Sequence, residues 1–106
     1  MPAMPIIVTA VFHPAEGRTA ELTEALRRTI PAVHEEQGCR LYAIHDADDG
    51  TITMIEKWDS REDLAAHAAG TAVKALGAAV ADLIAGPTTV ITMTPIPAGT
   101  PEQGEL

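Results

Sequence analysis

The sequence predicts an α+β domain whose elements follow the order β-α-β-β-α-β. Three observations lead to this order: short β-branched segments, longer segments with apolar residues at helical spacing, and turn-forming residues between them. With 106 residues, the chain is long enough for one domain with its own core. Hydrophobic residues make up 46% and charged residues 21%, as in globular proteins. We therefore expect a single folded domain.

The first half of the chain predicts a strand, a helix and a hairpin. The β-branched segment 6–13 predicts the first strand. Apolar residues recur every three or four positions over 16–36, which predicts an amphipathic helix with a kink at Pro31. The segments 39–46 and 51–58 predict two strands, and the residues ADDG between them are typical of a turn.

The second half predicts a broken helix and a last strand. Ser60 followed by Asp63 is typical of a helix start, and Gly70 interrupts the helix that follows. A second helical piece carries an apolar stripe as far as Ile84 and ends at a Gly-Pro pair. The segment 88–96 predicts the fourth strand. This order is the ferredoxin-like arrangement, in which helices cover one face of an antiparallel sheet.

The predicted strands carry apolar residues on both faces, as Ile7 and Val8 illustrate in the first strand. The helices cover only one face, and a domain over residues 1–96 has no further element for the other. We therefore expect a homodimer in which two sheets pack face to face around a β-barrel-like core. The remaining residues, 97–106, are acidic and contain Pro and Gly, so we expect a flexible tail.

Composition excludes several classes of partner. Seven basic residues stand against fifteen acidic ones, a formal net charge of −8, which argues against binding to nucleic acid or anionic membranes. The N-terminal segment has no basic residues and is interpreted as a strand, not a signal peptide. A single cysteine is compatible with a reducing compartment. These features predict a cytoplasmic protein.

The third strand raises the first question about a site. Alternation places Glu56 on the same face as Met54 and Trp58, a face that looks buried. If Ile44 pairs with Ile52 across the turn, Arg40 lies opposite Glu56.

Two interpretations of Glu56 are open and compatible. A partly buried ion pair with Arg40 would hold the hairpin together. Alternatively, Glu56 and Arg40 contact a ligand in a pocket also lined by Tyr42 and Trp58, whose polar atoms need partners when buried.

His67 is the best placed of the four histidines to act as a base. It lies three residues after Leu64, on the helix face that points to the sheet, and the break at Gly70 leaves room for a pocket. A histidine on an apolar helix face is also a common packing residue, so both roles stay open. The sequence has no HExxH motif, paired cysteines or glycine-rich phosphate loop, and we expect neither a metal nor another cofactor.

The stretch EEQGCRLYAIHDADDGTITMIEKWDSREDLAAHAAGTAVKAL resembles the antibiotic biosynthesis monooxygenase family, small dimeric ferredoxin-like proteins that include quinol monooxygenases. The matching positions, in order, are Gly38, Cys39, Tyr42, Glu56, Trp58 and His67. Several members oxidise quinols or polyketide anthrones with dioxygen and without a cofactor. The resemblance thus implies a small aromatic substrate, with His67 as the base and with Tyr42 and Trp58 enclosing the substrate.

Part of the family degrades haem with an Asn on the first strand and a His in the last helix. This chain contains no Asn, and its last predicted helix has no His, which argues against that chemistry. Two alternatives to an oxygenase stay open: a non-catalytic dimeric module that binds small molecules or serves in stress responses, and an isomerase of a small carbonyl metabolite.

Overall fold

The computed structural model describes residues 4–106, so the first three residues of the predicted domain lie outside the described part. The main elements are β1 (Ile6–Phe12), α1 (Thr19–His34), β2 (Cys39–Asp46), β3 (Ile52–Trp58), α2 (Arg61–Ala68), α3 (Thr71–Val80) and β4 (Thr89–Met93). A short helix, α4 (Pro101–Gly104), follows near the end of the chain. If α2 and α3 are counted as one interrupted helix, this is the predicted β-α-β-β-α-β order.

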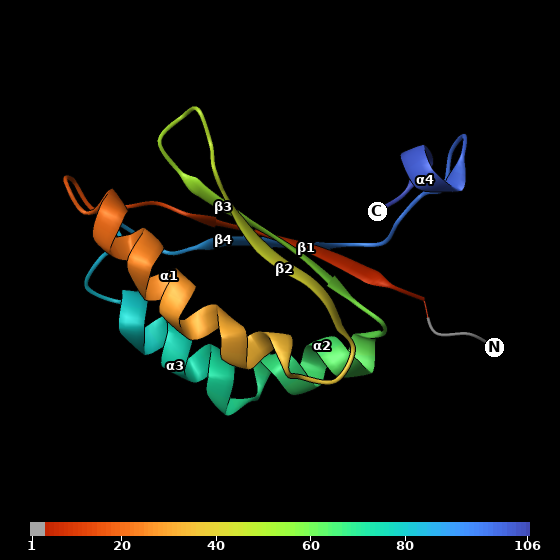
Figure 1. The fold of residues 1–106 in the computed structure, drawn as a ribbon, viewed down its shortest axis with the longest axis horizontal. Helices are drawn as coiled ribbons and strands as arrows, with labels where there is room; N and C mark the ends of the chain where they lie inside the picture. Colours follow the sequence, from red (N-terminus) through yellow and green to blue (C-terminus); the bar gives the residue numbers. More distant parts are fainter. Residues whose placement is uncertain (1–3) are drawn as a thin grey trace.

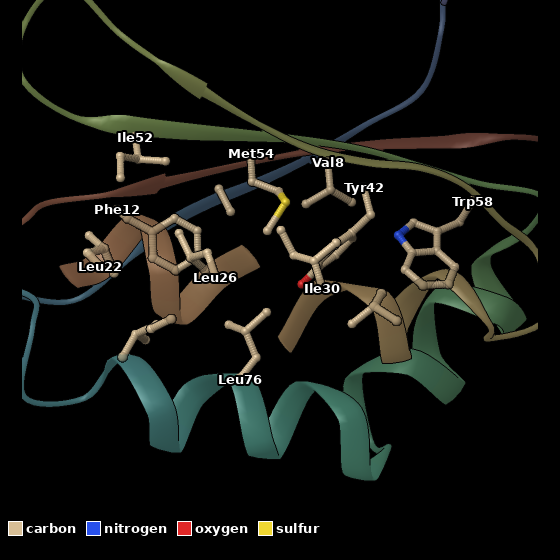
Figure 2. Packing of buried hydrophobic residues seen from close by; sticks show 14 of the residues in the cluster. Val8, Phe12, Leu22, Leu26, Ile30, Tyr42, Ile52, Met54, Trp58 and Leu76 are labelled. Carbon is tan, nitrogen blue, oxygen red and sulfur yellow. The ribbon is translucent and has the colours of Figure 1, made fainter. Parts of the chain in front are cut away.

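The four strands form one antiparallel sheet in the order β2-β3-β1-β4. Helices α1, α2 and α3 lie on one side of this sheet, and α4 lies on the other (Figure 1). The α+β class and the ferredoxin-like arrangement are therefore confirmed. Between the sheet and the helices, side chains from β1 and β3 meet those of α1 and α3 in a single core (Figure 2).

Strand alternation explains which side chains enter this core. In β3 every second residue is buried, from Ile52 to Trp58. On the neighbouring strand β1, Ile6 lies opposite Trp58 and is buried on the same face. Helix α1 contributes a buried stripe at helical spacing that includes Leu22 and Leu26, and it continues through Pro31 as one helix. The predicted single helix is thus confirmed, although it begins at Thr19, after a turn, and not at residue 16.

The predicted hairpin register is wrong by two residues. Ile44 lies opposite Met54 and Tyr42 lies opposite Glu56, because the strands close tightly enough for Asp46 to pair with Ile52. The loop that permits this closure is held by hydrogen bonds from the Thr51 N–H and hydroxyl to Asp49 Oδ1, and Gly50 adopts a φ of +88°. A shift of two residues keeps every side chain on its face, so the predicted faces are correct.

The second helical region also differs in detail. Ser60 Oγ accepts a hydrogen bond from the Asp63 N–H at 3.1 Å, which confirms the predicted cap of α2. Helix α3 ends at Val80, earlier than predicted, because the chain turns there and Ile84 forms a β-bridge with Pro14. Strand β4 is shorter than the predicted 88–96. The segment 97–106 contains helix α4. The carbonyl of its last residue, Leu106, accepts a hydrogen bond from Lys57 Nζ.

The other face of the sheet carries apolar side chains with no helix of α1–α3 above them. Its residues follow from the strand registers and include Ile7, Leu41, Ile55, Ile91 and Met93. Ile91 and Met93 are 54% and 38% exposed. We call this surface the open face.

Candidate active site

A cavity of about 480 Å³ lies between the sheet and the helices α2 and α3. Most of its lining is apolar and includes Val8, Phe12, Leu64, Val73, Leu76 and Val80. Tyr42, Glu56 and His67 bring polar atoms to the same cavity. Its volume and its few polar groups are typical of sites for small organic ligands.

Trp58 explains why a carboxylate lies on the buried face of β3. Its indole Nε1–H donates a hydrogen bond to Glu56 Oε1 at 2.9 Å, and both side chains point to the helices because they are two residues apart. Trp58 is fully buried, so its N–H needs this acceptor. Burial raises the pKa of Glu56, while the bond from Trp58 and the nearby His67 oppose that rise.

The predicted ion pair between Arg40 and Glu56 is wrong. An irregularity in the pairing between Cys39 and Leu41 turns Arg40 outward, where its guanidinium forms two 2.8 Å hydrogen bonds with Asp59. The Arg40 side chain is 64% exposed and does not line the cavity. Of the predicted site residues, the structure therefore brings together Tyr42, Glu56, Trp58 and His67, and it leaves Arg40 outside.

His67 is buried at the C-terminal end of α2, with its ring in an aromatic cluster. The ring lies 4.5 Å from that of Trp58, centroid to centroid, at an angle of 32°. It also contacts Tyr42 edge to face, with the centroids 5.4 Å apart. Three residues of the predicted site thus form one group at the polar end of the cavity.

Glu36 is a further member of the site that the sequence did not reveal. Its Oε1 lies 2.6 Å from His67 Nδ1, and its side chain is 23% exposed. The loop after α1 places it there: the Glu36 N–H donates to the Val33 carbonyl, and the Glu36 carbonyl accepts from the Cys39 N–H. The adjacent acidic residues before Gly38 were the available signal, but they do not tell which carboxylate points inward.

Two other groups near the cavity stay protonated. Burial, followed by the charges of Glu56 and Glu36, raises the pKa of the Tyr42 hydroxyl, so this group can donate a hydrogen bond at neutral pH. Burial is also the main cause of a raised pKa for the Cys39 thiol, with the same two carboxylates adding to it. A raised pKa disfavours the thiolate and so argues against Cys39 as a nucleophile.

The described part of the chain contains neither a cluster of metal-ligating side chains nor a helix suited to a membrane. Within residues 4–106, no three side chains of His, Cys, Asp or Glu come together as a metal-binding group. None of the helices in that range has the length and apolar character needed to cross a membrane.

The sequence and the fold are similar to those of known proteins. The model of the antibiotic biosynthesis monooxygenase family matches residues 5–79. The chain belongs to this family, and the predicted membership is confirmed.

One relative is similar to this chain in both sequence and structure. The chain is 29% identical over 93 residues to a Mycobacterium tuberculosis protein named "Putative monooxygenase Rv0793", and the match covers 87% of this chain and 92% of the relative. The solved structure of Rv0793 superposes with a TM-score of 0.81 at 27% identity, covering 91% of this chain and 99% of the other.

Two further structures share the fold. Protein SO0527 from Shewanella oneidensis is 28% identical with a TM-score of 0.77, covering 86% of this chain and 90% of the other. An antibiotic biosynthesis monooxygenase homologue from Caulobacter crescentus CB15 has a TM-score of 0.81 at 23% identity, with 89% and 92% covered. At that identity, the likeness supports the fold alone.

Proposed function

We propose that this protein is a cofactor-independent monooxygenase that oxidises a small quinol or polycyclic phenol with dioxygen. The observation that carries the proposal is the buried His67 ring, which lies against Trp58 at the polar end of an otherwise apolar cavity. Membership of the family supports the reaction class. The substrate class rests on the chemistry of the cavity.

The cavity suits a flat, apolar molecule with a hydroxyl group at one end. Apolar side chains from β1 and α3 would hold the rings, and the polar end would receive the hydroxyl. The Tyr42 hydroxyl can donate a hydrogen bond to a substrate oxygen, and Glu56 can accept one through Oε2, since Trp58 occupies Oε1.

In the proposed reaction, His67 takes the proton of the substrate hydroxyl and leaves a phenolate. The phenolate is electron-rich enough to reduce dioxygen, and the apolar walls keep water away from the reacting pair. For a hydroquinone, one oxygen atom replaces a ring hydrogen as a new hydroxyl and the other leaves as water. The product is a hydroxyquinone. The substrate supplies all four electrons, so the proposed reaction needs no metal or other cofactor.

Oxygen uptake tests this proposal. We expect the purified protein, in buffer with a chelator, to accelerate oxygen consumption by dihydroxynaphthalene or anthrone above the rate without protein. With ¹⁸O₂, the product should gain one labelled oxygen atom. The exposed variant Arg28→Ala serves as a control and should behave as wild type.

Two other outcomes would favour the alternatives to an oxygenase. Saturable binding of these aromatics without accelerated oxygen uptake would contradict the oxygenase and favour the non-catalytic binding module. Turnover of a small carbonyl compound without oxygen uptake would favour the isomerase.

We further propose that two copies pack through the open face. Ile91 and Met93 of β4 are exposed there, beside the apolar side chains of β1 and β3, and a matching apolar sheet would bury them. Light scattering should give about twice the chain mass of 11.1 kDa. Ile91→Lys should shift the mass toward the monomer, whereas Ala78→Lys on the exposed side of α3 should not. A monomeric wild-type protein would contradict the dimer.

We also propose a cytoplasmic location, because the free thiol of Cys39 suits a reducing compartment. Cell fractionation would test it, and recovery of the protein outside the cytoplasm would contradict it.

A further inference from the structure

The Glu36 carboxylate can only accept the hydrogen bond that joins it to His67. It is held 2.6 Å from Nδ1, so Nδ1 carries the hydrogen in the neutral ring. The other ring nitrogen, Nε2, is then left with its lone pair. Within residues 4–106 no hydrogen-bond partner of Nε2 is recorded, and His67 lines the cavity.

We propose that Glu36 is a positioning residue that fixes the tautomer and the orientation of His67, so that Nε2 accepts the substrate proton. This inference rests on the proposed function for its catalytic meaning. When the O–H bond of the substrate breaks and the Nε2–H bond forms, the ring becomes an imidazolium ion. Its positive charge is then paired with the Glu36 carboxylate at Nδ1.

A second observation shows that the fold makes room for this carboxylate. A Cβ atom on Gly70 would lie only 3.0 Å from Glu36 Oε2, closer than ordinary van der Waals contact. Gly70 is also the residue at which α2 and α3 separate. A side chain at position 70 would therefore crowd the Glu36 carboxylate, and the break between the two helices lies where the Glu36 side chain passes.

The neighbouring residues distinguish Glu36 from an ordinary surface acid. Glu35, next to it, is exposed and has no recorded side-chain hydrogen bond within the described chain. Glu56, the other carboxylate near the ring, accepts from Trp58, and no hydrogen bond to His67 is recorded for it within residues 4–106. Within residues 4–106, Glu36 is therefore the carboxylate that is hydrogen-bonded to the imidazole of His67, and Glu56 is not.

Nitrogen-15 NMR of the histidine rings tests the proposal without an activity assay. At about pH 9, above the usual imidazole pKa of about 6.5, the ring nitrogen shifts report the neutral tautomer directly. His67→Ala assigns the His67 signals. The assignment is needed because His45 Nδ1 also lies 3.2 Å from a carbonyl, that of Thr53.

We expect the wild-type ring to carry its hydrogen on Nδ1. Glu36→Ala should shift the tautomer toward Nε2–H, whereas Glu36→Gln should keep it, because the amide oxygen still accepts a hydrogen bond. Glu35→Ala is the matched control and should change nothing. If Glu36→Ala does not fold, Glu36→Leu offers a second route, since its side chain is of similar size but cannot accept a hydrogen bond, and it should shift the tautomer in the same direction.

Kinetics connect the tautomer to the reaction. Glu36→Ala should lower kcat about 10–100-fold with little change in KM, comparable to the loss of an orienting partner of a metal-bound histidine. Glu36→Gln should recover much of that loss. In a His67→Ala background, Glu36→Ala should cost nothing more.

The two proposals fail separately. An unchanged tautomer in Glu36→Ala or, where that variant does not fold, in Glu36→Leu would overturn the role of Glu36 even if oxygen uptake is found. A wild-type ring with its hydrogen on Nε2 would do the same. The expected tautomer change in a protein that consumes no oxygen would support the positioning of His67 and overturn only the oxygenase.

Discussion

The layer between the sheet and the helices has two ends of different chemistry. At one end lie Leu22 and Ile52, which do not line the cavity, and Trp58 lies at the other end (Figure 2). The first end is apolar. The second end also holds the carboxylate of Glu56 and the imidazole of His67, both about 95% buried, since each is 5% exposed.

The apolar end stabilises the fold, whereas the polar end carries the groups that the proposed site requires. Burial of apolar side chains at the first end is favourable wherever they fit. Burial of a carboxylate is unfavourable unless it is hydrogen-bonded, and the bond from Trp58 offsets that cost only in part, because the pKa of Glu56 is still raised. We infer that the polar end is retained for function at some cost in stability.

Leu26→Ala should give the largest change in stability. Leu26 is fully buried in α1, and its truncation should lower the free energy of unfolding by about 2–5 kcal/mol. Activity per folded molecule should be nearly unchanged if the apolar end only stabilises the fold. Urea denaturation at fixed protein concentration measures the loss, with the exposed Arg28→Ala on the same helix as control. Activity that falls well beyond the loss of folded protein would contradict the separation of the two ends.

Glu56→Gln should change how stability depends on pH. Because the pKa of Glu56 is raised above its ordinary value of 4.5, the folded protein holds this proton more tightly than the unfolded chain does. As pH rises from about 4.5 through the folded pKa, the wild type therefore loses stability that the variant keeps.

Urea titrations from about pH 4 to pH 8 measure this difference, and Glu16→Gln on the surface is the control. A wild type that gains stability over Glu56→Gln with rising pH would mean that an ion pair, and not desolvation, dominates at this carboxylate. The variant should also lower turnover if Glu56 contacts the substrate.

Arg40→Ala should have the smallest effect. The ion pair with Asp59 is exposed on both sides, and such pairs contribute little because solvent screens them. Thermal unfolding and oxygen uptake should both stay close to wild type. A marked loss of turnover with the fold intact would return Arg40 to the site, where the sequence had placed it.

The sequence was sufficient for the elements and the faces because both depend on local periodicity. Alternation placed Glu56 and Trp58 on one buried face, and helical spacing turned His67 toward the sheet, as observed. The register was missed because it depends on how tightly the loop around Asp49 closes, which the strand pattern does not encode.

Glu36 was missed for a related reason. Its contact with His67 joins residues 31 positions apart and depends on the path of the loop after α1. Nothing in the local pattern distinguishes it from the exposed Glu35. The bond between Trp58 and Glu56 could have been predicted, since Trp58 lies two residues away on the same strand face and its buried indole N–H needs an acceptor.

Oxygen uptake by His67→Ala tests the central claim, that the polar end of the cavity performs base-assisted oxidation. With dihydroxynaphthalene at neutral pH, the rate should fall about 100-fold or more while circular dichroism shows an intact fold. The deficit should shrink at high pH, where the substrate ionises without a base, and the exposed His45→Ala should match wild type. A folded His67→Ala protein that consumes oxygen at the wild-type rate at neutral pH would contradict the account.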